Sequence, residues 1–514
     1  MEVPQPTPLQ GNRTTIELLL VCLAGAAMFM PGLWNRDLWH PLEPGYAETA
    51  SEIVKSGNWL QLTRNGRPYY NKPPLFFWLE ALGVKAFGLR TAALRLPSVI
   101  LGIGALVLTY LIARRLGINP LASSLVLATA WTYDLSCQRA NIDVTLCFLV
   151  VLAFYLYLLS AEQGRHAWLC AVGAAVAAAL GVLAKGPVVL LWLGCAIFPY
   201  LMWRKKWKQV FHWKWCIALL IVAAIALSWL FLVGRLEGPR FYQVILGREL
   251  GKRFDPDAES AVGPLFYVVR FPISFLPWFL YFPFAIALAW RRRNQPSFQV
   301  LLWFAASFLA FSLVPVKMSR YIVPLLPAAA LLVGAYLTER DNRIGLVALW
   351  AYAAGAVALM VATVFREPAA LGYSFALGIP ALACSIVGLL LWPRLRFKAL
   401  VIVAAVTFLA YSVTIIPYRN KAKSPRPLAE FLNSQGATGG DIVWVEKYEA
   451  GVAFYGGYTR MRQVETLESL NDYPHAYIIT TSEFVKKHPT VFGSAQPLRT
   501  FHMDANEYLV FKTP

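Results

Sequence analysis

Long apolar runs alternate with short polar turns through the first four-fifths of this chain. Each run has about 17 to 25 residues, and a helix of that length crosses a hydrocarbon core about 30 Å thick. The pattern predicts thirteen membrane-spanning helices, at 16–33, 93–112, 120–136, 144–161, 167–184, 186–203, 215–233, 266–290, 298–315, 321–337, 344–364, 373–392 and 398–416. We therefore expect the fold class to be a polytopic membrane bundle of α-helices.

Two polar interruptions and a change of pattern divide the chain. Residues 34–92 and 234–265 are predicted external loops of a membrane domain over 1–420. From about Lys421 the pattern becomes short strand-like runs with helix-like segments between them, which predicts a small soluble α/β domain over 421–514. That domain contains no phosphate-loop or dinucleotide motif. It serves either in acceptor or partner recognition or as a stabilising cap.

The first external loop concentrates acids, bases and aromatic residues. Pro44 suits the first turn of a helix, because the proline nitrogen has no hydrogen to leave unpaired there, and Gly57 suits the end of that helix. Glu43 then stands at the N-terminus, where the helix dipole favours an ionised carboxylate. Glu43 is either a base or hydrogen-bond acceptor beside a lipid headgroup, or a helix cap. Residues 75–88 predict a second interfacial helix.

Composition and charge agree with a membrane protein. Of the 514 residues, 58% are hydrophobic and 15% are charged, whereas soluble proteins have about 25% charged residues. The net charge of +19 does not indicate nucleic-acid binding, because the basic residues concentrate in short loops on one side of the predicted bundle. That side is expected to be the cytoplasm. The N-terminus is then cytoplasmic, and the C-terminal domain lies on the external side.

Cysteines and histidines give no sign of a metal site. The seven cysteines lie in or near apolar spans, where packing explains them, and the six histidines are scattered. We expect no required cofactor, although a divalent metal is compatible with the acids.

Further polar residues mark the external ends of spans. Asp143 opens the fourth span, either as a charge favoured by the helix dipole or as an active-site acid. Lys185 stands between two apolar runs, either at the level of lipid headgroups or in contact with a phosphate. The external basic residues Lys185, Arg253, Lys317 and Arg320 are predicted to hold a phosphate or pyrophosphate together. The loop that contains Arg253 is either a substrate gate or a solvated segment.

A series of short motifs adds a resemblance. The motifs LWHPLEPGYAE, SGNW, NGRPYYNKPPLFFW, LRLPS, RANID, AKGP, ELGKRF, LPW and VKMSRYIVPLLP occur in this order between residues 34 and 340. In this order they resemble the polytopic GT-C glycosyltransferases that use polyprenyl-phosphate sugars, particularly the bacterial lipid A aminoarabinose transferases and the protein-mannosyltransferase-like family. The resemblance implies an inverting enzyme that moves a sugar from a polyprenyl phosphate, such as undecaprenyl phosphate, to lipid A or another lipid or protein acceptor. It also implies a bacterial inner-membrane protein whose C-terminal domain is periplasmic.

The resemblance also implies roles for individual residues. Such enzymes usually carry an Asp-Glu pair in the first external loop, but here Leu42 replaces the aspartate and Glu43 stands alone. We predict Glu43 as the principal catalytic carboxylate, with Asp143 and Glu48 as alternatives. Lys185 and Arg253 match residues near the lipid phosphate. The predicted substrate-binding residues are Lys72, Tyr69, Arg139, Lys185, Arg253, Lys317, Arg320 and Tyr321.

Two other classes of function remain open from the sequence. A transporter of lipid-linked sugars would also have many spans, but its charged site would lie near the membrane midplane and not at one face. A catalytically silent relative with a binding role would account for Leu42. Within the glycosyltransferase class, protein O-glycosylation is an alternative to lipid modification.

Overall fold

The computed structural model describes residues 11–34, 36–40, 42–162, 164–245, 262–339, 344–366, 371–493, 495–503 and 506–514. The chain divides into two compact units. The first unit comprises Met1–Gly32, Tyr70–Phe76 and Pro97–Thr414, and the second comprises Leu33–Tyr69, Phe77–Leu96 and Ile415–Pro514. The first unit holds most of the apolar helices, and the second combines much of the first polar loop with the C-terminal segment. The predicted domain boundary at residue 420 stays a prediction.

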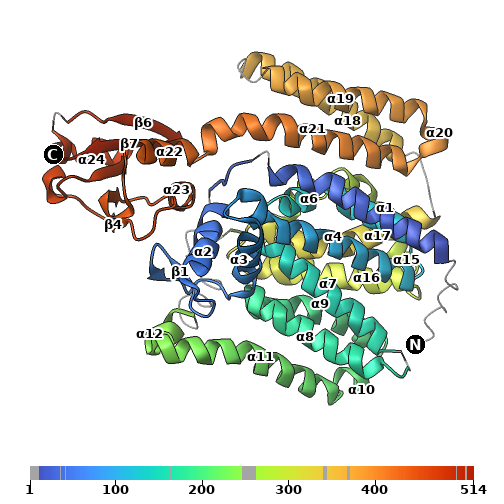
Figure 1. Cartoon of the computed structure of the whole chain (residues 1–514). Coiled ribbons are helices and arrows are strands. Elements are labelled where there is room, and N and C mark those ends of the chain that lie inside the picture. Colours follow the sequence, from blue (N-terminus) through green and yellow to red (C-terminus); the bar gives the residue numbers. More distant parts are fainter. Residues whose placement is uncertain are drawn as a thin grey trace. The chain divides into compact units, whose positions relative to one another are not determined.

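Apolar helices form the first unit (Figure 1). In chain order the longer ones are α1 (Gly11–Phe29), α4 (Thr91–Arg115), α5 (Pro120–Ala128), α7 (Ile142–Ser160), α8 (Ala167–Lys185), α9 (Val188–Trp203), α11 (Lys214–Glu237), α14 (Phe266–Ser274), α15 (Phe282–Arg291), α16 (Pro296–Leu313), α17 (Leu326–Glu339), α18 (Ile344–Arg366), α19 (Leu371–Leu390) and α21 (Phe397–Lys423). Many of their large apolar side chains are exposed. The chain is therefore a multi-pass membrane protein, since such surfaces are stable in lipid and not in water.

The number of spans differs from the prediction. Within the described residues, ten helices are long and apolar enough to cross a membrane, or eleven if the pair bent by 112° between Phe266 and Arg291 is one span. Thirteen spans are not confirmed. The predicted span at 120–136 is two short helices, α5 and α6 (Trp131–Cys137), and α9 has only 16 residues. Apolar side chains in α5 are buried within the protein, and burial produces the same hydrophobic pattern as lipid contact.

Helices α7 and α8 bring two polar residues together. Asn141 caps α7, because its side chain accepts a hydrogen bond from the amide of Asp143 (2.9 Å). Helix α8 ends at Lys185, and the next residue, Gly186, has a φ of 86° that glycine adopts without strain. The short connection makes α7 and α8 antiparallel neighbours. The start of α7 therefore lies beside the end of α8.

Most of the first polar loop belongs to the second unit, and it contains the helix predicted between Pro44 and Gly57. Helix α2 (Glu43–Ser56) has proline in its first turn, and the amide of Gly57 bonds to the carbonyl of Ile53 (2.9 Å) at its end. A hairpin of β1 (Thr63–Arg64) and β2 (Arg67–Pro68) follows, and then α3 (Leu75–Phe87) begins. Helix α2 is buried on all its sides over most of its length, since every residue from Glu43 to Ile53 is buried.

The C-terminal segment contains the predicted α/β structure. Its sheet has the order β4-β3-β5-β7-β6, with strands β3 (Ile442–Val445), β4 (Arg462–Val464), β5 (Tyr477–Thr481), β6 (Arg499–Met503) and β7 (Asn506–Lys512). Strand β3 is parallel to β4 and β5, and β7 is antiparallel to β5 and β6. Helices α22 (Arg426–Ser434), α23 (Ala450–Gly456), α24 (Ser482–Lys487) and α25 (Pro489–Phe492) accompany it.

Two apolar clusters cover the two faces of this sheet. Ile442 and Trp444 pack with Val452 in one cluster, whereas Val443 packs with Phe484 in the other. Alternate residues of β3 thus face opposite sides, and both sides are buried, which explains the uninterrupted apolar sequence of this strand. Within the same unit, α23 packs against α2. The first polar loop and the C-terminal segment therefore share one folded unit.

Candidate functional site

A buried ion pair joins α7 to α8 in the first unit. The ammonium group of Lys185 donates to the carboxylate of Asp143, which is fully buried. Arg320, in the 3₁₀ helix η4 (Ser319–Leu325), brings its Nε atom within 3.6 Å of the other oxygen of Asp143. The side chain of Arg320 keeps 25% of its surface exposed. Two cations thus meet one acid, so this cluster carries a net positive charge.

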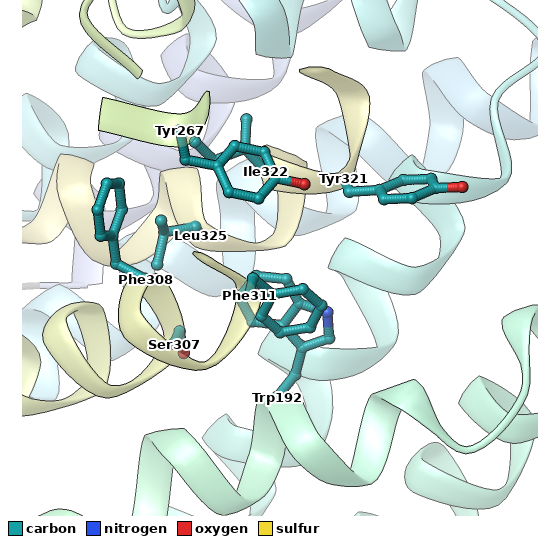
Figure 2. Close-up of a pocket in the computed structure, with 8 residues that line it drawn as sticks. All are labelled: Trp192, Tyr267, Ser307, Phe308, Phe311, Tyr321, Ile322 and Leu325. Carbon is teal, nitrogen blue, oxygen red and sulfur yellow. The ribbon is translucent and has the colours of Figure 1, made fainter. Parts of the chain in front are cut away.

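Tyr321 connects the charged cluster to an apolar pocket. Its ring lies 4.1 Å from Nζ of Lys185, a cation–π contact. Figure 2 shows Tyr321 with the other residues that line the pocket, among them Tyr267 and the stacked pair Trp192 and Phe311. The pocket is small, with a cavity volume of about 10 Å³, which is room for about one water molecule. Its lining, which is mostly aromatic and aliphatic, places an apolar surface beside the cations.

Three other predicted residues also lie in the first unit. Lys317 donates to the carbonyl of Val262 (2.8 Å), and burial lowers the pKa of its ammonium group. Lys72 donates to the carbonyl of Asn71 (2.9 Å). Arg139 follows α6 and is half-buried. Arg253 lies outside the described residues. The structure thus brings together Asp143, Lys185, Arg320 and Tyr321 out of the predicted set.

Glu43 lies between two guanidinium groups in the second unit. Arg36 donates to its Oε2 atom (2.7 Å), and Arg95 donates to both oxygens (2.8 and 3.1 Å). All three side chains are buried. Burial alone would raise the pKa of Glu43, but the two arginines outweigh it and hold this pKa well below its usual range. Glu43 is therefore an ionised acceptor at every working pH and a weak proton base.

Glu48 has a different environment one turn further along α2. It is buried and accepts a hydrogen bond from the hydroxyl group of Tyr448. Burial raises the pKa of Glu48 to about 7, and the hydrogen bond from Tyr448 and the charge of Arg64 oppose that rise. Glu48 therefore titrates near neutral pH. Glu52, on the next turn, accepts from the hydroxyl of Thr63 and from the amide of Gly66 (3.1 Å).

Three further residues of the second unit belong to this region. The guanidinium of Arg64 lies 4.1 Å from the ring centre of Tyr69 and donates to the carbonyl of Gly45 (2.8 Å). Tyr69 thus helps to hold Arg64 beside the start of α2. Glu80 in α3 is fully buried, and both its oxygens lack a hydrogen-bond partner among the described residues. Burial, reinforced by the charge of Glu43, raises the pKa of Glu80 well above its usual value.

Sequence reasoning missed Arg36, Arg95 and Glu80. Arg95 belongs to the LRLPS motif, which we used for the resemblance without giving the arginine a role. One signal was available in the sequence: Arg95 is a charged residue within an apolar helix, and a charged side chain in such a place needs a partner. Its partner could not be named, because 52 positions separate Arg95 from Glu43.

Within the described residues, no three His, Cys, Asp or Glu side chains come together as a metal site.

Comparisons with known proteins agree with this picture. Residues 71–231 match the family described as dolichyl-phosphate-mannose-protein mannosyltransferase. An Aquifex aeolicus protein without an assigned function is 28% identical over 80% of this chain and 82% of its own length. The undecaprenyl phosphate-alpha-4-amino-4-deoxy-L-arabinose arabinosyl transferase of Pseudomonas paraeruginosa is 30% identical over 64% of this chain. The match spans about three-fifths of that relative, at 61% of its length.

The fold is shared with a solved structure. The crystal structure of ArnT from Cupriavidus metallidurans bound to undecaprenyl phosphate superimposes with a TM-score of 0.83, at 20% sequence identity, over 97% of this chain and 98% of that one. The chain therefore has the GT-C fold. It resembles the glycosyltransferases that use polyprenyl-phosphate sugars, as its motifs predicted, and the aminoarabinose transferases in particular.

Proposed function

We propose that this chain is an inverting membrane glycosyltransferase that moves a sugar from a polyprenyl-phosphate donor to a lipid acceptor on the outer face of the bacterial inner membrane. One observation carries the proposal: the cationic cluster of Lys185, Arg320 and Tyr321 adjoins an apolar pocket. A polyprenyl-phosphate sugar has the same two parts, an anionic phosphate and a hydrocarbon chain. The undecaprenyl phosphate-linked sugar in the name of the Pseudomonas paraeruginosa relative and the undecaprenyl phosphate bound to the solved structure support this choice of donor.

The cations act on the leaving group. When the acceptor attacks the anomeric carbon, the bond from that carbon to the phosphate oxygen breaks, and the polyprenyl phosphate leaves with additional negative charge. Lys185 and Arg320 stabilise that charge, and Arg253 is predicted to join them. Asp143 keeps the two cations in place before the donor arrives. A single displacement of this kind inverts the configuration at the anomeric carbon.

The environment of Glu43 favours one class of acceptor. A general base is effective when its pKa lies near the working pH, and the two arginines keep the pKa of Glu43 far below it. An acceptor phosphate is already ionised and needs no base, whereas an acceptor hydroxyl group does. We therefore favour a phosphate group of a lipid A-like molecule, with Glu43 orienting the sugar through hydrogen bonds. Glu48, whose pKa is raised to about 7, is the better candidate if the acceptor is a hydroxyl.

The experiment uses cells with and without this gene and follows their glycolipids by mass spectrometry. A missing mass increment on one lipid when the gene is absent supports the proposal and identifies the sugar and the acceptor together. An increment lost from proteins supports protein glycosylation instead. If purified chain in vesicles moves lipid-linked sugar between leaflets without transferring it, the chain is a transporter.

A further inference from the structure

The C-terminal segment holds Asp37 of the first polar loop from both sides. The hydroxyl group of Ser424 donates to Oδ2 of Asp37 (2.8 Å), and the hydroxyl group of Tyr455, in α23, donates to Oδ1 (3.3 Å). The oxygen of Tyr455 also accepts from the amide of Leu38 (2.9 Å). Asn420, near the end of α21, accepts from the amide of Asp37 (3.1 Å). These contacts all lie within the second unit.

The same short stretch positions the arginines around Glu43. Arg95 donates to the carbonyl oxygens of Arg36 (2.6 Å) and Asp37 (3.0 Å) as well as to Glu43. Arg36 in turn donates to Glu43 through its side chain. The backbone at residues 36 and 37 is thus bound on one side by the C-terminal segment and on the other by the group that pairs with Glu43.

We propose that Tyr455 and Ser424 are positioning residues for the transfer reaction, which act through Asp37 and Arg95 on Glu43. The inference rests on the proposed function. It gives the C-terminal segment a role in the chemistry, beyond acceptor recognition or capping. Because the Arg36–Arg95 pair contacts both oxygens of Glu43, a shift of the backbone at Asp37 changes the direction in which this carboxylate points. A misplacement of about 1 Å far from the reacting atoms can slow an enzyme roughly 100-fold.

The experiment compares Tyr455→Phe and Ser424→Ala with Tyr458→Phe in the full-length chain. Tyr458 is the matched control, because its hydroxyl group bonds to Asn433 within the C-terminal segment. We expect kcat to fall roughly 10- to 100-fold in the first two variants, with an unchanged KM for the donor. Tyr458→Phe is expected to keep the kcat of the original chain. A raised KM with unchanged kcat in Tyr455→Phe and Ser424→Ala would overturn the inference.

A double variant separates positioning from general stability. If Tyr455 acts through Glu43, Tyr455→Phe should lower kcat little further in a Glu43→Gln background. Equal losses in both backgrounds would overturn the inference.

Hydrogen exchange of the backbone amides at 36–56 gives a readout that does not depend on activity. It should be faster in Tyr455→Phe and Ser424→Ala than in Tyr458→Phe, and equal rates would overturn the coupling. If Tyr455→Phe and Ser424→Ala exchange faster but the original chain transfers no sugar, the proposed function is rejected. The coupling between the C-terminal segment and residues 36–56 then still holds.

Discussion

Arg95 donates hydrogen bonds to both oxygens of Glu43, from Nε to Oε1 (2.8 Å) and from Nη2 to Oε2 (3.1 Å). This two-pronged geometry is specific to arginine, whose planar fork matches a carboxylate. Arg95 sits at the start of α4 and Glu43 at the start of α2, and both are buried. Arg36 and Arg95 together keep Glu43 ionised, and this limits the chemistry that Glu43 can perform.

Arg95→Met should destabilise the chain, because it leaves a buried carboxylate with one arginine in place of two. Breaking a buried ion pair costs about 3 to 5 kcal/mol, and Arg36 limits the loss to the lower end of that range. Thermal unfolding of the purified chain measures the effect. Arg90→Met is the control, since Arg90 is exposed. Equal unfolding temperatures for the two variants would show that the Arg95 pair contributes no net stability.

Glu43→Gln tests the assignment of this carboxylate as an ionised, orienting group. We expect kcat to fall roughly 100-fold while KM for the donor stays constant. The pH profile of kcat should keep its shape, because the pKa of Glu43 lies well below the working range. A rising limb near neutral pH in the original chain that disappears in Glu43→Gln would instead identify Glu43 as a base.

Glu48→Gln should remove part of the pH dependence of stability. Because the folded chain raises the pKa of Glu48 from 4.5 to about 7, it binds this proton more tightly than the unfolded chain does. The free energy of unfolding then falls as the pH rises from about 4.5 to 7, by about 3 kcal/mol for this group. Chemical unfolding at a series of pH values measures it. Glu80 adds a change of the same sign, so the informative quantity is the difference between the original chain and Glu48→Gln.

Lys185→Met should lower both stability and activity, since it leaves Asp143 buried beside Arg320 alone. The single variant should lose about 3 kcal/mol of unfolding free energy. The double variant Lys185→Met with Asp143→Asn removes the uncompensated charge and should recover most of that loss. It should not recover donor affinity, because the cation for the phosphate is still missing. Lys85→Met, at an exposed lysine, is the control. Full activity in the double variant would remove Lys185 from the donor site.

Cysteine labelling tests the predicted orientation of the chain. In a background without the native cysteines, Glu430→Cys should react with an impermeant thiol reagent added outside the intact inner membrane. Lys206→Cys should react only after the membrane is opened, because the basic loops are predicted to be cytoplasmic. The reverse pattern would place the candidate site on the cytoplasmic side.

The sequence by itself determined the class of the protein and the local geometry of its loops. Runs of apolar residues long enough to cross a bilayer require a helical membrane protein, because lipid satisfies no backbone hydrogen bonds. Pro44 and Gly57 set the two ends of α2 by their own backbone restrictions, and short apolar runs such as Ile442–Val445 indicated the strands of the C-terminal sheet. The motif order between residues 34 and 340 indicated the family that it resembles. All of these signals are local in the chain.

Only the tertiary structure decided which charged residues meet. Lys185 and Asp143 were both candidates from the sequence, but the antiparallel packing of α7 and α8 makes them an ion pair. Arg36 and Arg95 received no role from the sequence, although together they hold the pKa of Glu43 below its usual range. The number of spans also depended on packing, since α5 is apolar because it is buried in protein. A charge or an apolar side chain in a sequence shows only that it needs a compatible environment, and the folded chain supplies that environment from distant positions.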